Sequence, residues 1–88
     1  MKKTQTYKIM QPSEIFAVNL RGLMAMKNVS PAEMQEYMGI SNATYYKRLK
    51  RPCEFTLRDM ESAAKKLGVH LADMIGGIMT VGAGGGAA

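Results

Sequence analysis

Apolar residues recur at intervals of three and four along most of this chain, which is the spacing of one face of an α-helix. The pattern predicts five helices joined by short turns, at about residues 13–27, 31–38, 42–50, 56–67 and 70–78. The apolar face of the first helix consists of Phe16, Leu20, Leu23 and Met24, and that of the fourth of Leu57, Met60, Ala64 and Leu67. We therefore expect an all-α domain over residues 13–78.

Residues that favour helix ends lie at the boundaries of these predicted helices. Ser13 is the expected N-cap of the first helix. The run Ser30-Pro31-Ala32-Glu33 has the form of a capping box with proline at the first helical position, and Thr56 begins a similar box at the fourth helix. Gly39 and Gly68 follow the second and fourth helices, where a residue with positive φ commonly ends a helix.

Only three residues, Gly39-Ile40-Ser41, separate the second and third helices. A glycine allows the positive φ that a sharp turn requires, and Ser41 is placed to cap the next helix at once. Two short helices joined in this way predict a helix-turn-helix.

The third helix has two different faces when it is projected at about 100° per residue. Tyr45 and Leu49 lie about 40° apart and form the expected inward face. The opposite face centres on Ala43 and Lys47, whereas Tyr46 lies at the border between core and surface. The outward face is small, polar and basic, which suits insertion into a DNA major groove.

Charge is concentrated on this third helix. The 88-residue chain has a net charge of +5, and 47% of its residues are hydrophobic, as in a small globular domain. The end of the helix carries four cations, Lys47, Arg48, Lys50 and Arg51, with Arg48 expected on the surface. Since no acidic residue occurs between Tyr37 and Cys53, this surface indicates a polyanionic partner. The alternative to a polyanionic partner is a charged face that contacts only solvent.

The chain has one cysteine, Cys53, and one histidine, His70. This composition rules out an internal disulfide and makes a metal site improbable. We find no phosphate-binding loop and no nucleophile beside a base. The sequence therefore predicts no enzyme activity, no cofactor, no metal and no small-molecule ligand.

These residues resemble a known family. Residues 20–41 are similar to the first two helices of the lambda-repressor-like (Cro and repressor type) DNA-binding family. Residues 39–52 resemble a variant found in small phage and prophage regulators. The resemblance covers about residues 13–76 and implies a five-helix fold that binds double-stranded DNA and regulates transcription.

Roles carried over from the family fall on the third helix. The resemblance implies base contacts by Asn42, Ala43 and Lys47, with asparagine able to pair with adenine and lysine with guanine. It implies phosphate contacts by Ser41, Thr44, Tyr46, Lys50 and Arg51. The chain departs from the family in the second helix. Pro31 replaces a common glutamine, and Gln35 replaces a small alanine and must pack differently.

The remaining predictions concern the chain ends and partners. Residues 1–12 form a predicted arm, in which Lys2 and Lys3 are placed to reach around the duplex, and residues 79–88 form a predicted flexible Gly-rich tail. A homodimer through the C-terminal helix is expected, using Ile75, Ile78 and Met79 unless these residues pack internally. No signal peptide or membrane segment is evident, so the cytoplasm is the expected location. The alternative function is a protein-interaction module, such as an antitoxin or an adaptor.

Overall fold

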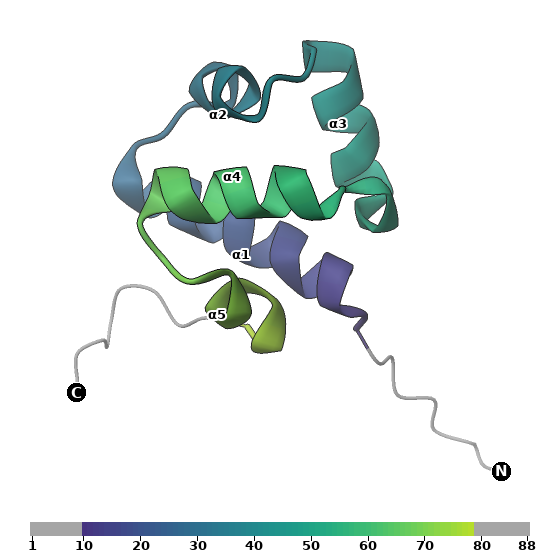
Figure 1. The fold of residues 1–88 in the computed structure, drawn as a ribbon, viewed down its shortest axis with the longest axis vertical. Helices are drawn as coiled ribbons and strands as arrows, with labels where there is room; N and C mark the ends of the chain where they lie inside the picture. The colour runs from purple at the N-terminus through teal and green to yellow at the C-terminus, as the bar shows by residue number, and fades with distance from the viewer. Residues whose placement is uncertain (1–9, 79–88) are drawn as a thin grey trace, which may run out of the picture.

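The computed structural model describes residues 10–78, which form an all-α fold (Figure 1). The helices are α1 (Pro12–Lys27), α2 (Pro31–Met38), α3 (Asn42–Lys50), α4 (Leu57–Leu67) and α5 (Leu71–Gly76), with a 3₁₀ turn, η1, at Pro52–Glu54. The described residues contain no strand, so the predicted all-α class with five helices is confirmed. Most of the predicted arm and all of the predicted tail lie outside the described residues.

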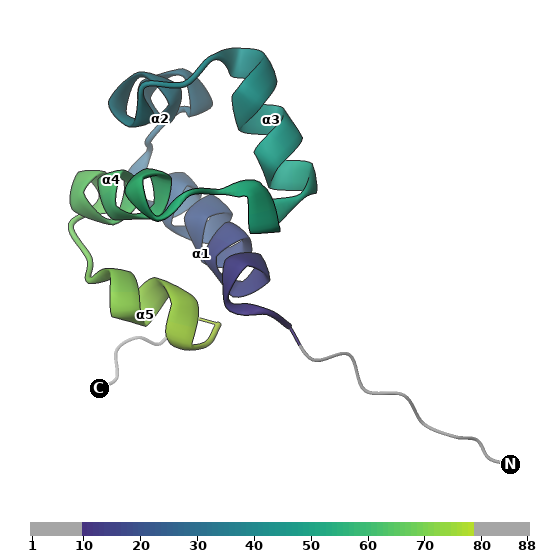
Figure 2. The same ribbon diagram turned by 45° about the vertical axis from the view of Figure 1, so that its right-hand side comes forward.

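The helices are arranged around the pair α1 and α4. In Figures 1 and 2, α2 and α3 lie on one side of this pair and α5 lies on the other. Helix α5 packs against both α1 and α4, whereas α2 packs mainly on α4. Helix α3 lies next to α2 on one side and η1 on the other, at the edge of the fold (Figure 1).

The core is formed by side chains from every helix. Phe16 and Phe55 meet edge to face with ring centroids 5.2 Å apart, a favourable aromatic geometry. The predicted apolar face of α4 is wrong at its first residue, because Leu57 is 62% exposed. Phe55, two residues before it, turns into the core beside α1 instead. The other fully buried large side chains are Leu20, Met34, Tyr45, Leu67 and Met74.

Two predicted capping boxes are present. The hydroxyl of Ser30 accepts the backbone N–H of Glu33 at 3.1 Å, and the Glu33 carboxylate accepts the backbone N–H of Ser30 at 2.9 Å. These bonds hold the pKa of Glu33 below its usual value. Thr56 and Asp59 form the same reciprocal pair at α4. Each box satisfies two backbone donors that a helix N-terminus otherwise leaves unpaired.

Helix α1 begins one residue before the predicted start, because Pro12 occupies its first position. Gln11, and not Ser13, is the N-cap residue, and its backbone N–H donates to the Glu14 carboxylate at 2.8 Å. Proline suits this position since it has no N–H to satisfy. The predicted N-cap at Ser13 is therefore wrong, and Pro12 belongs to the helix and not to an arm.

Helix α5 ends earlier than predicted, at Gly76, and Ile78 lies beyond it. The buried side chain of Asn19, on α1, donates to the carbonyl of Met74 at 2.8 Å and to that of Gly77 at 2.9 Å. These carbonyls belong to the helix end, where acceptors lack partners within the helix. Asn19 therefore attaches the end of α5 to α1.

Candidate nucleic-acid interface

One buried tyrosine anchors α3 to the rest of the molecule. Tyr45 is 2% exposed, and its hydroxyl donates to the sulfur of Met24, on α1, at 3.4 Å. Leu49, one turn later, is half-buried against the same core. The inward face predicted for this helix is therefore confirmed, and it fixes which side chains face outward.

Five side chains form a continuous exposed face on α3. This outward face consists of Asn42, Ala43, Tyr46, Lys47 and Lys50. Tyr46, which the sequence places at the border, is 47% exposed and belongs to this face. The three predicted base-contact residues thus lie together with two of the predicted phosphate-contact residues.

Arg48 is less exposed than predicted. Its guanidinium turns toward α4 and pairs with the carboxylate of Asp59 at 2.5 Å, which leaves the Arg48 side chain 24% exposed. Asp59 is itself buried, so an unpaired carboxylate there would be costly. One of the four clustered cations therefore neutralises a buried acid and is not available to a ligand.

Arg51 follows α3 and remains on the surface. Its guanidinium lies 3.2 Å from the carboxylate of Glu54, in the following 3₁₀ turn. Lys47 and Lys50 form no ion pair with any residue that the structure describes. The free positive charge of the outward face therefore resides mainly in these two lysines.

The N-terminus of α3 is closed by its own side chains. The Ser41 hydroxyl accepts the backbone N–H of Thr44 at 3.1 Å and donates to the Thr44 hydroxyl at 3.0 Å. Ser41 is exposed and Thr44 is half-buried. Both predicted phosphate-contact residues therefore lie at the tip of α3, beside the outward face.

A hydrogen bond crosses the turn between α2 and α3. The side-chain amide of Gln35 donates to the side-chain carbonyl of Asn42 at 2.9 Å. Gln35 was expected to pack differently from a small alanine, and it packs by spanning the turn. The first residue of the outward face is thus held by a partner on the preceding helix.

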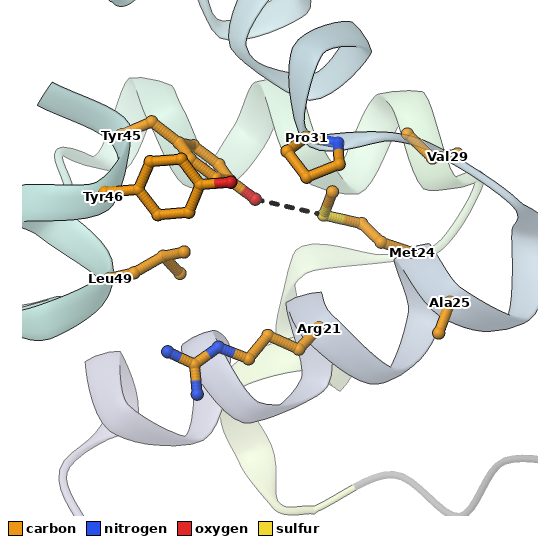
Figure 3. Close-up of a pocket in the computed structure, with 8 residues that line it drawn as sticks. All are labelled: Arg21, Met24, Ala25, Val29, Pro31, Tyr45, Tyr46 and Leu49. Carbon is orange, nitrogen blue, oxygen red and sulfur yellow. Dashed lines mark hydrogen bonds between the residues drawn. The ribbon is translucent and has the colours of Figure 1, made fainter. Parts of the chain in front are cut away.

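A cavity of about 340 Å³ lies between α1 and α3, next to the outward face (Figure 3). Its walls are mostly apolar, and Tyr45 and Tyr46 line it from α3 with ring centroids 5.0 Å apart. Arg21, on α1, brings an exposed guanidinium to the same cavity, and sequence reasoning did not single it out. Burial raises the pKa of Tyr45, and Arg21 partly opposes that effect. The other lining residues are Met24, Ala25, Val29, Pro31 and Leu49.

Residues 10–78 contain no group of three or more His, Cys, Asp and Glu side chains that could hold a metal ion. Cys53 is exposed and forms no disulfide. No helix within this range has the length and apolar character that crossing a membrane requires.

Comparison of the chain with protein-family models, curated proteins and solved structures found no match.

Proposed function

We propose that this protein binds double-stranded DNA sequence-specifically and regulates transcription, with α2, the turn and α3 acting as a helix-turn-helix. The observation that carries the proposal is the outward face of α3. It presents an amide, a methyl group and two lysines that form no ion pair within residues 10–78, on a helix held from behind by buried Tyr45. An α-helix is about 10–12 Å wide, which matches a major groove about 12 Å wide.

Within this proposal the residues have distinct tasks. Asn42, Ala43 and Lys47 contact base edges, because they lie on the outward face and carry groups that suit direct readout. Lys50 and Tyr46 lie on the same face and contact phosphates. Arg51, Ser41 and Thr44 contribute further phosphate contacts from the two ends of the helix.

We also propose that the protein binds DNA as a homodimer. One recognition helix reads only a few base pairs, so two helices about 34 Å apart on a two-fold site supply useful specificity. The proposed contact is at the C-terminal end, where Ile78 is 56% exposed and Ile75 is half-buried. Met79 lies outside the described residues, and Met74 is fully buried inside the monomer.

The cellular context belongs to the same proposal. A cytoplasmic regulator of phage or prophage type is the role that the family resemblance of residues 13–76 supports. Such a protein acts by occupying a promoter or by recruiting another protein to it. Lys2 and Lys3, which lie outside the described residues, are proposed to add contacts around the duplex.

The test is binding of the full chain to duplex DNA across a series of salt concentrations. The logarithm of the binding constant is expected to fall linearly with the logarithm of salt, by about 0.9 per neutralised phosphate. We expect several phosphates to be neutralised by each subunit. Lack of binding at low salt, or binding that ignores salt, would contradict the proposal. Sedimentation of the free protein and of the complex tests the dimer separately.

A further inference from the structure

The cavity between α1 and α3 takes no part in the proposed DNA contacts, except through Tyr46 at its edge. Its volume of about 340 Å³ lies within the range of roughly 300–1,000 Å³ that small-molecule sites occupy. Met24, Val29 and Leu49 supply apolar walls, and no aspartate or glutamate lines it. The walls therefore suit a ligand with a compact apolar body and no positive charge.

Two aromatic rings form the α3 side of the cavity (Figure 3). Tyr45 and Tyr46 meet edge to face at an interplanar angle of 84°. The Tyr45 ring is buried, and its hydroxyl already donates to the sulfur of Met24. The Tyr46 ring is exposed, and its hydroxyl forms no hydrogen bond within residues 10–78. Tyr46 can therefore contact an aromatic ligand with its ring and donate to it from its hydroxyl.

Arg21 gives the cavity a positive charge. Its side chain reaches from α1 toward the α3 side in Figure 3, and it is exposed where the cavity opens to solvent. Arg21 forms no ion pair within residues 10–78. Burial raises the pKa of Tyr45, and the charge of Arg21 partly opposes that effect, so this charge acts within the cavity. A guanidinium can bind one carboxylate through two parallel hydrogen bonds.

We propose that this cavity binds a small aromatic carboxylate, with its ring between the apolar walls and its carboxylate on Arg21. A neutral apolar ligand would leave the guanidinium unused, and a small inorganic anion would leave the apolar walls in contact with water. The sequence alone predicts no small-molecule ligand, because the lining residues belong to separate helices and converge only in the packed fold.

Occupation of the cavity opposes DNA binding, a step that rests on the proposed function. Tyr46 belongs both to the cavity and to the outward face of α3. Its hydroxyl has one hydrogen to donate, so it cannot serve the ligand and a phosphate together. The ligand also adds a negative charge beside this face, where it repels phosphates. By linkage, the ligand and DNA weaken each other's binding by the same factor.

The first experiment titrates the full chain with cinnamate and follows the NMR signals of Arg21, Tyr46 and Leu49. Saturable shifts are expected at these residues. Cinnamamide has the same body without the charge, and acetate has the charge without the body. Both are expected to bind about ten-fold more weakly than cinnamate, the effect of one hydrogen bond to a charged group. Equal binding of cinnamate and cinnamamide, or shifts that never saturate, would overturn the site.

Three variants locate the bound probe. Arg21→Gln removes the charge from an exposed position and should lower the affinity for cinnamate about ten-fold, with the affinity for cinnamamide unchanged. Lys27→Gln is the matched control, because it removes an exposed cation of the same helix that does not line the cavity. Ala25→Phe enlarges an exposed side chain of the cavity wall and should weaken the binding of both probes. Equal losses in Arg21→Gln and Lys27→Gln would show that cinnamate responds only to net charge and would contradict the site.

The second experiment measures the affinity for duplex DNA with and without saturating cinnamate, at fixed ionic strength. A fall on the order of five-fold is expected, which is typical of coupling between two sites. Acetate at the same concentration should cause no fall, and Arg21→Gln should lose the response to cinnamate. If the chain binds no duplex at low salt, the proposed function and the coupling both fail, whereas saturable binding of cinnamate still supports the site. If the chain binds duplex and saturating cinnamate leaves its affinity unchanged, only the coupling fails.

Discussion

The guanidinium of Arg48 lies 2.5 Å from the carboxylate of Asp59, and this contact joins α3 to the N-terminus of α4. The same carboxylate accepts the backbone N–H of Thr56 at 3.0 Å, so it caps α4 as well. A buried acid with two donors is well satisfied, whereas one that loses a donor is not. The pair therefore helps to attach α3 to α4.

Arg48→Ala is expected to destabilise the protein by about 2 kcal/mol, since it leaves the carboxylate of Asp59 buried without its cation. The partial exposure of Arg48 keeps the loss below that of a fully buried pair. The matched control is Arg58→Ala on the exposed side of α4, where a change within about 0.5 kcal/mol is expected. Urea unfolding measures both. Equal losses of unfolding free energy in the two variants would show that the ion pair does not stabilise the protein.

Lys50→Ala is expected to weaken binding to all DNA sequences alike and to flatten the salt dependence by about one phosphate. Arg51→Ala should have the smaller effect, because Glu54 already neutralises part of its charge. Asn42→Ala and Lys47→Ala should instead relax sequence preference, by about 1–3 kcal/mol at the contacted base pair. Titrations with matched and mismatched duplexes distinguish the two behaviours. Identical behaviour of the two groups would contradict the assignment of the outward face.

Asn19→Leu is expected to loosen α5, because the carbonyls of Met74 and Gly77 lose the donor that attaches them to α1. A loss of about 1–3 kcal/mol is typical when buried polar groups lose a partner. Hydrogen exchange should accelerate in α5 more than in α2 or α3. The neighbouring Val18→Ala serves as control, since Val18 is exposed and lies on the same helix. Unchanged exchange in α5 would contradict a role for Asn19 as its attachment.

Stability is expected to fall at alkaline pH through Tyr45. Burial raises its pKa in the folded state above the usual tyrosine value, with Tyr46 adding to this effect and Arg21 opposing it. The folded state therefore binds the phenolic proton more tightly than the unfolded state does. The resulting stabilisation is complete below the unfolded pKa and is lost as the pH rises toward the folded pKa.

Tyr45→Phe removes this titration and keeps the ring in the core. The unfolding free energy of wild type should therefore fall relative to that of the variant above about pH 10. Other alkaline titrations, such as those of the lysines, affect both proteins and cancel in the difference. A constant difference across this pH range would contradict the burial of the phenol. Tyrosinate absorbance during a pH titration, compared with that of the Tyr46→Phe variant, identifies the tyrosine that ionises at the higher pH.

Local signals in the sequence were sufficient for most of the helix boundaries. The capping boxes at Ser30 and Thr56 depend on residues three positions apart, which a linear pattern records directly. The left-handed residues Gly39 and Gly68 end their helices for the same local reason, with φ near 73° and 71°. The inward face of α3 was likewise readable, because Tyr45 and Leu49 are one turn apart.

Contacts between distant residues were not readable in this way. The Arg48–Asp59 pair joins residues 11 positions apart, and Asn19 reaches a carbonyl 55 positions away. Such contacts form only when helices pack, so the sequence places Arg48 on the surface and extends α5 too far. Leu57 is predicted in the core for a related reason, since only the packed fold shows that Leu57 is exposed and Phe55 is buried.

By itself the sequence determined the helices, their caps, the short turn and the basic character of α3, since each depends on neighbours within about one turn of helix. Tertiary packing decided which charges of α3 remain free, how α5 is attached and how Asn42 is held. It did so because burial of Asp59 and closure of the turn impose partners that no local pattern contains. The outward face of α3 therefore depends both on the local sequence and on tertiary packing.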